Sequence, residues 1–185
     1  MKFLLSYSFL FVLYDTLHRC SAGDSPIDAT SLLQVETRVK YILDDKTAPF
    51  LGINSACITV EMVNSTSPYL AIVDYMVESK WNTLVYTGTP SSSPSSHQPA
   101  LIYFTTSESD ASVEYQTHEL LQFERSACFV LSGVSRQGCY LWKVLSEEAE
   151  TKTSNCPEKP KSIEACNSEF EKCKAYNNEQ CSTWL

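Results

Sequence analysis

The sequence predicts a mostly β protein: an eight-stranded antiparallel up-and-down barrel with a C-terminal helix packed on it and held by disulfides. Three observations support this fold class. Eight short runs of alternating apolar and polar residues lie between residues 35 and 145, with turn-forming residues between them. The pattern becomes helical near the C-terminus. Cysteines occur both in the strand-like runs and in this last segment, so disulfides can join the two.

The N-terminus predicts a secretory signal peptide. After a basic start, Phe3 to Tyr14 is apolar but shorter than the roughly 20 residues that a membrane-spanning helix needs. The small residues Cys20 and Ala22 place the expected cleavage after Ala22. We therefore expect a secreted, extracellular protein, because disulfides persist in oxidising compartments. This cleavage leaves an odd number of cysteines, which implies one free or intermolecular thiol or a cleavage site nearer the N-terminus.

Three segments are expected: the signal peptide at 1–22, an N-terminal segment at 23–34 and one barrel domain at 35–185. The formal net charge is −8 and the sequence pI is near 4.9. Lys and Arg form no cluster, so neither nucleic acid nor an anionic membrane surface is an expected partner. Asn64 opens an Asn-Ser-Thr sequon in a turn-rich stretch, and we expect it to be glycosylated.

Alternation of residue types justifies the strands in chain order. In the first run Val39, Tyr41 and Leu43 share one face and polar residues fill the other. Clusters of Ser, Asn, Pro and Gly end the runs, Ser79–Lys80 predicts a hairpin turn, and residues 90–99 form a Ser/Pro-rich loop. The predicted strands are Val35–Leu43, Cys57–Val63, Tyr69–Glu78, Trp81–Thr89, Leu101–Thr106, Val113–Phe123, Ala127–Ser132 and Gly138–Leu145.

The segment Pro160–Tyr176 predicts the helix. Ile163, Cys166, Phe170 and Cys173 recur at three- and four-residue spacings, so one helix face is apolar and carries thiols. Eight up-and-down strands followed by a packed helix match the lipocalin plan, in which the barrel encloses an interior large enough for one small ligand.

Four sequence features, in this order and spacing, carry a resemblance to a known family: Pro49–Gly52 before Cys57, the Tyr-x-Thr run Tyr103–Thr105, Cys128–Val130, and Cys139–Trp142 followed by the terminal cysteines. In these features the chain resembles the salivary lipocalins of ticks, the group that includes the histamine-binding proteins. The resemblance runs from about Val35 to the end of the chain. It implies a salivary protein that sequesters a small host mediator in its barrel and so modulates inflammation or immunity.

The chain departs from the amine-binding pattern of that family. Phe129 and Tyr140 stand where amine-binding members have acids, and Leu51 stands where the family has tryptophan. Glu119 does correspond to an acid of the pattern. A protonated amine inside a barrel needs carboxylate partners, because an unpaired buried charge is costly. We therefore expect an apolar ligand, such as an eicosanoid, a fatty acid or a sterol such as cholesterol.

Two alternatives stay open. Family membership and Glu119 keep a scavenger of histamine or serotonin possible. The loop at residues 91–99 could instead bind a host immune protein, such as a complement component. The candidate ligand-binding residues are Trp142, Tyr140, Phe129, Glu119, Tyr103, Tyr41 and Phe123.

Catalysis and metal binding find no support in the sequence. His97 and His118 are isolated, and no further residue completes a metal site at the usual spacing. No nucleophile elbow or phosphate-binding Gly-rich loop occurs. We expect a protein that is not an enzyme and that carries no metal and no cofactor.

The expected disulfides tie the C-terminal segment to the sheet. Bridges that close long loops remove the most conformational entropy from the unfolded chain. On this ground we predict Cys57–Cys181, which closes the longest loop, together with Cys128–Cys156 and Cys139–Cys166, which leaves Cys173 unpaired. The alternative joins Cys139 to Cys173 across the other turn of the helix.

Overall fold

The computed structural model describes residues 27–34, 38–63, 66–91, 100–106, 116–133, 137–145, 155–161 and 163–182. The predicted signal peptide, Asn64, and most of the loop at 91–99 lie outside these residues. The side chains of residues 178–182, Cys181 among them, are also outside the described part of the chain.

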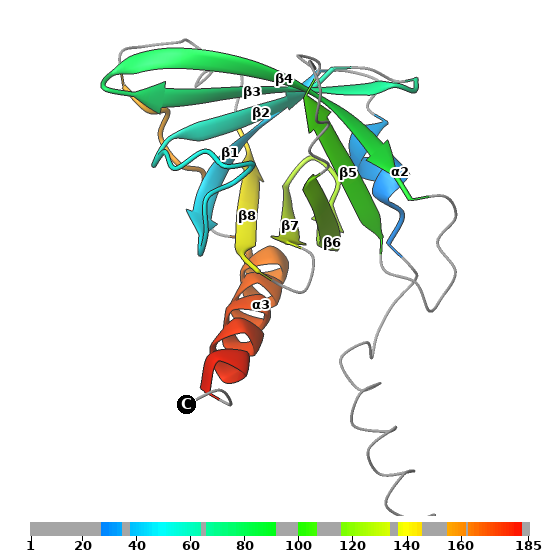
Figure 1. Ribbon diagram of the computed structural model, residues 1–185, viewed down its shortest axis with the longest axis vertical. Coiled ribbons are helices and arrows are strands. Elements are labelled where there is room, and N and C mark those ends of the chain that lie inside the picture. The colour runs from blue at the N-terminus through cyan, green and yellow to red at the C-terminus, as the bar shows by residue number, and fades with distance from the viewer. Residues whose placement is uncertain are drawn as a thin grey trace, which may run out of the picture.

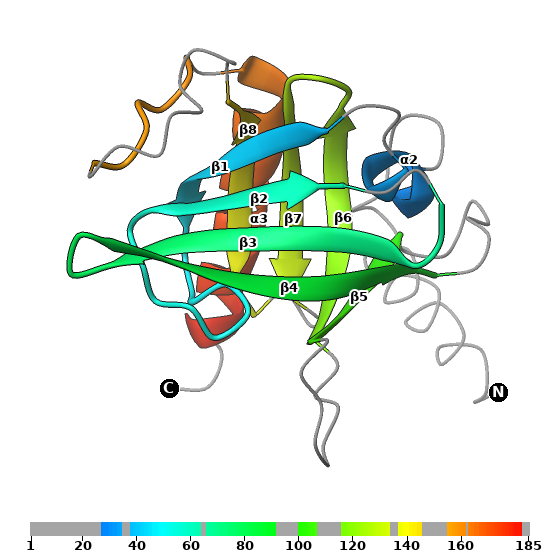
Figure 2. The same ribbon diagram turned by 90° about the horizontal axis from the view of Figure 1, so that it is seen from above.

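Eight strands form a closed antiparallel barrel in which each strand pairs with its neighbours in sequence and β8 pairs with β1 (Figures 1 and 2). The predicted fold class is confirmed. The strands are β1 (Val39–Lys46), β2 (Ile58–Met62), β3 (Tyr69–Val77), β4 (Lys80–Pro90), β5 (Leu101–Thr106), β6 (Gln116–Glu124), β7 (Cys128–Gly133) and β8 (Cys139–Val144).

The alternation in the sequence predicts strand positions close to the observed ones, and β5 has the predicted bounds. The first strand begins at Val39, and the predicted start at Val35 lies outside the described residues. The hairpin between β3 and β4 turns at Glu78 and Ser79, which both have positive φ values of 49° and 63°. Two residues with positive φ match the right-handed twist of the paired strands, which is why this tight turn closes a long ribbon.

Within the described ranges, two helices accompany the barrel. The short α2 (Ala29–Leu33) begins after Asp28, whose carboxylate accepts a hydrogen bond from the Thr30 backbone amide. The long α3 (Glu164–Ser182) lies outside the barrel against β6, β7 and β8 (Figure 2). None of the helices within the described ranges combines the length and the hydropathy needed to cross a membrane.

The predicted thiol-bearing face of α3 is the face that packs on the sheet. Cys166, Phe170 and Cys173 are buried, and Ile163 packs beside them. They meet a small apolar cluster on the outer face of β7 and β8, centred on Val130 and Leu141. The barrel therefore has two separate apolar clusters, one inside it and one beneath α3.

The three disulfides correct the predicted pairing. Cys57 bonds to Cys156 instead of Cys181, Cys128 bonds to Cys166 instead of Cys156, and Cys139 bonds to Cys173. The last pair is the alternative that the sequence left open, so Cys173 is not the unpaired thiol. The pairing follows from where the cysteines lie in the fold. Cys166 and Cys173 are about two turns apart on α3 and lie opposite β7 and β8.

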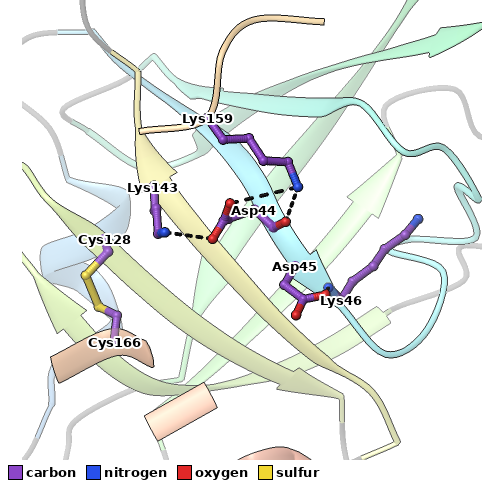
Figure 3. A network of polar contacts seen from close by, with 7 residues as sticks. All are labelled: Asp44, Asp45, Lys46, Cys128, Lys143, Lys159 and Cys166. Carbon is purple, nitrogen blue, oxygen red and sulfur yellow. Dashed lines mark hydrogen bonds and ion pairs between the residues drawn. A yellow bond between two sulfur atoms is a disulfide. The ribbon is translucent and has the colours of Figure 1, made fainter. Parts of the chain in front are cut away.

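A buried ion pair ties the C-terminal segment to the barrel wall (Figure 3). Lys143 of β8 is 4% exposed, and its Nζ lies 2.7 Å from Oδ2 of Asp44 on β1. Lys159 reaches the same aspartate from the segment 155–161, at 3.8 Å from Oδ1, and also donates a hydrogen bond to the Asp44 carbonyl. One carboxylate thus holds together β1, β8 and the segment that carries Cys156.

Candidate ligand-binding site

The candidate site is the interior of the barrel, which the alternation of the strands fills with apolar side chains. Inward positions form one buried cluster to which every strand contributes. Its members on the strands are Tyr41, Leu43, Ile58, Val60, Met62, Tyr69, Ala71, Val73, Tyr86, Ile102, Phe104, Leu120, Phe129, Leu131, Tyr140 and Trp142. Such a lining suits an apolar molecule, because burying apolar surface releases about 25 cal/mol per Å².

Aromatic rings gather at one region of this interior. Trp142 stacks on Phe129 with ring centroids 5.6 Å apart and an interplanar angle of 15°. Tyr41 meets Phe129 edge-on at 4.8 Å. The ring of Phe50 lies 4.8 Å from Trp142 and 5.3 Å from Tyr140, again edge-on in both cases. These offset and edge-on geometries are the favourable ones for aromatic pairs.

The loop between β1 and β2 carries Phe50 into the barrel. Phe50 and Ile53 exchange two backbone hydrogen bonds around a two-residue turn of Leu51 and Gly52. Both turn residues have positive φ, 48° and 77°, a conformation that glycine adopts without strain. The turn buries the Phe50 side chain to 1% exposure, so this loop closes one end of the barrel.

Several contacts fasten the same loop to β8 and β1. The hydroxyl of Tyr140 donates to the Pro49 carbonyl at 3.0 Å, and the Cys139 amide donates to Thr47 Oγ1 at 2.9 Å. Gly138 permits this approach, because a Cβ there would lie 2.9 Å from the Ala48 Cβ. Lys46 Nζ donates to the Ser55 carbonyl at 2.7 Å.

The opposite end of the barrel is covered by α2. Leu32 and Leu33 are fully buried and belong to the interior cluster. Leu33 packs so closely on β4 that a Cβ at Gly88 would lie 3.1 Å from its Cδ2. The interior is thus enclosed by the strands on all sides, by the β1–β2 loop at one end and by α2 at the other.

Among the residues that the structure describes, two polar atoms inside this apolar enclosure have no hydrogen-bond partner in the protein. They are Nε1 of Trp142 and Nδ1 of His118. Trp142 is 0% exposed and His118 is 4% exposed. A buried polar atom without a partner costs about 1–3 kcal/mol. Buried indole and imidazole groups normally find partners, so these two atoms mark positions at which a ligand atom would stabilise the protein.

His118 lies among aromatic rings. The rings of Phe50, Tyr140 and Phe104 surround the imidazole at centroid distances of 5.4, 5.5 and 5.7 Å. Burial lowers the pKa of His118 from 6.5 to about 4, although a hydrogen bond with the Gln116 backbone acts in the opposite direction. The imidazole is therefore neutral at physiological pH.

Burial shifts the pKa values of the tyrosines in the same region. It raises the pKa of Tyr41 to about 12 and raises that of Tyr140 above its ordinary value. Both hydroxyls are therefore protonated at neutral pH. The aromatic region of the interior carries no charge on its tyrosines or on its histidine.

The structure brings together most of the predicted site residues and separates two of them. Tyr41, Phe129, Tyr140 and Trp142 are all buried in the interior cluster, and Phe123 packs against it in a half-buried position. Tyr103 and Glu119 are only half-buried and belong to the other strand face. Their neighbours in the β5–β6 ladder, Ile102 and His118, are the inward ones.

The position of Glu119 bears directly on amine binding. It lies between two inward residues of β6, His118 and Leu120, so its side chain starts from the outer face. Asp74 and Glu61 are also outward and pair with Lys40 and Arg38. Among the residues that the structure describes, no carboxylate lines the barrel interior.

Two features of the site were missed in the sequence. Phe50 lies in a turn, and its inward direction depends on the backbone of Leu51 and Gly52 rather than on any alternation. His118 shares its strand face with Leu120, a spacing of two that would have placed it inside the barrel.

No family model, curated protein or solved structure matches this chain. In the described part of the chain, no group of three His, Cys, Asp or Glu residues is arranged to hold a metal ion. The function is therefore inferred from the side chains that line the barrel interior.

The buried imidazole predicts a pH-dependent stability. Because the folded-state pKa of His118 is lowered, the unfolded chain binds more protons between about pH 4 and pH 6.5. Stability should fall by on the order of 3 kcal/mol as pH drops through that window. Urea unfolding at several pH values, compared between the wild type and His118→Phe, measures this contribution. Parallel curves for the two proteins would show that His118 titrates normally.

Proposed function

We propose that this chain is a secreted lipocalin, similar to the salivary lipocalins of ticks, which sequesters a small and largely apolar host mediator in its barrel and so modulates inflammation or immunity. The closed barrel with an enclosed apolar interior supports ligand binding. The three disulfides fit an oxidising compartment. The protein acts by binding and carries out no chemical step.

The observation that carries the ligand class is the uncharged lining of the interior. Phe129 and Tyr140 point inward at the positions where the amine-binding pattern has acids. Glu119, the remaining acid of that pattern, is on the outer face. A buried ammonium group needs a carboxylate partner, and an apolar ligand does not. An eicosanoid, a fatty acid or a sterol therefore suits this interior better than histamine or serotonin.

Calorimetry tests the preference for apolar ligands. A charge-assisted hydrogen bond contributes about 1.5–3 kcal/mol, so the absence of two such partners weakens amine binding by at least one to two orders of magnitude. We expect arachidonate, a leukotriene or cholesterol to bind more tightly than histamine or serotonin. Glu119→Gln is the matched control. It should change neither the affinity for the apolar ligands nor the affinity for the amines. Nanomolar histamine binding that disappears in Glu119→Gln would contradict the proposal.

A further inference from the structure

The two side chains that carry the unpartnered polar atoms both lie next to the ring of Phe50. The Phe50 ring lies 4.8 Å from the Trp142 ring and 5.4 Å from the His118 ring, so both polar side chains border the place where the β1–β2 loop closes the barrel. They come from β8 and β6, which are not paired with each other. Both side chains therefore contact the same Phe50 ring, although their strands are not neighbours in the sheet.

The chemistry of these atoms defines what each requires. The indole Nε1 of Trp142 can only donate a hydrogen bond, so it needs an acceptor. The Nδ1 of a neutral imidazole donates or accepts according to its tautomer. A hydroxyl group is both a donor and an acceptor, so hydroxyl groups can satisfy both atoms whichever tautomer is present.

The lack of charge in the interior limits which ligand head groups can bind there. The interior offers no carboxylate among its described residues, so an ammonium group would lie there without a partner. Burial keeps the His118 imidazole neutral, so a carboxylate group would not meet a cation there. The amine of Lys46 is engaged by carbonyls of the β1–β2 loop. An uncharged head group avoids these desolvation costs.

Building on the proposed function, we propose that Trp142 and His118 form the polar end of the ligand site and select an apolar alcohol. A hydroxyl oxygen of the ligand accepts from Trp142 Nε1, and the same or a second hydroxyl meets His118 Nδ1. The hydrocarbon part of the ligand packs on the apolar lining. A bound alcohol would thus provide a hydrogen-bond partner for each of the two atoms.

A series of ligands with one chain and different head groups tests this assignment. Dodecanol, its methyl ether, dodecane, dodecanoic acid and dodecylamine are compared by displacement of a fluorescent apolar probe. One neutral hydrogen bond contributes about 1 kcal/mol, so dodecanol should bind about five- to tenfold more tightly than dodecane. It should also bind more tightly than the acid and the amine.

Variants connect that preference to the two side chains. Trp142→Phe should remove most of the advantage of the alcohol over the alkane. His118→Phe should reduce the same advantage of the alcohol over the alkane, because it removes the second hydrogen-bonding atom. Phe104→Leu is the control, because it removes apolar volume from the same region and should weaken alcohol and alkane binding equally. The readout is the ratio of alcohol affinity to alkane affinity in each variant. A substitution that weakens the binding of both ligands equally leaves this ratio unchanged.

The stability of the ligand-free protein gives an independent measurement. His118→Phe removes a buried unpaired atom together with the hydrogen bond to the Gln116 backbone, so the Tm of the ligand-free protein should change little while alcohol affinity falls. A residue with a purely structural role would lower both.

The outcomes separate the two proposals. Equal affinity for alcohol and alkane, unchanged by either variant, would overturn the hydroxyl assignment and leave apolar ligand binding intact. Tighter binding of the acid or of the amine would overturn the assignment as well. No binding of any member of the series would overturn both proposals.

Discussion

Replacing Cys57 and Cys156 together with serine should lower the free energy of unfolding by about 3–5 kcal/mol. This disulfide closes a loop of 99 residues, the longest of the three, so its removal releases the most conformational entropy in the unfolded chain. Chemical denaturation of the double variant measures the loss. The pair is replaced together so that neither Cys57 nor Cys156 is left as a thiol without its partner.

Cys181→Ser is the matched control for this experiment. Because Cys57 bonds to Cys156, the single variant at 181 should leave the Cys57 disulfide intact and the stability close to that of the wild type. Peptide mapping without reduction should recover Cys57 linked to Cys156. A loss of several kcal/mol in Cys181→Ser, with Cys57 found as a free thiol, would contradict this pairing.

Asp44→Asn should destabilise the protein by about 3–5 kcal/mol, because it leaves the buried Lys143 ammonium without its carboxylate partner. The same change removes the ion pair to Lys159, which is about half exposed and contributes little. Urea unfolding measures the effect. Asp45→Asn is the control: Asp45 is exposed, and its loss should cost less than about 0.5 kcal/mol.

A second substitution separates the cost of an unpaired charge from the loss of a contact. Combining Asp44→Asn with Lys143→Met removes both charges and replaces the ammonium by an apolar group. Most of the stability should then return, because the penalty lies in the uncompensated buried charge. A double variant as unstable as Asp44→Asn alone would show that the aspartate acts through a different interaction.

The strands could be predicted because a barrel wall imposes a period of two on its residues. Tyr41 and Leu43 face inward as their spacing indicated, and the same rule holds through Tyr140 and Trp142 on the last strand. The helix was predictable for the same kind of reason, since Cys166, Phe170 and Cys173 repeat at its period. Such patterns depend only on residues that are close together in the chain, so they can be recognised in a single sequence.

The disulfide pairing was not predictable by the same means. The entropy of loop closure describes the unfolded chain, and it favours long loops without regard to which sulfur atoms meet in the fold. Cys57 lies just before β2 and bonds where the segment 155–161 passes, at a Cα–Cα distance of 5.7 Å. That crossing depends on the path of the chain between β8 and α3.

The structure gathers some of the predicted site residues in the interior and places others on the outer strand face. The family pattern that Glu119 matches does not indicate the strand face on which the residue lies. His118, its immediate neighbour, is the residue that faces inward. Phe50 could not be located because a turn with positive φ values directs it, and no periodicity describes such a turn.

Native mass spectrometry of the protein purified from a eukaryotic secretion host tests the central claim, that the barrel holds an apolar molecule. We predict a bound species with the mass of a lipid or sterol, released on denaturation. Ala71→Trp, which fills the interior from β3, should reduce its occupancy. A folded protein that carries no such mass and takes up neither arachidonate nor cholesterol when these are added would contradict the account.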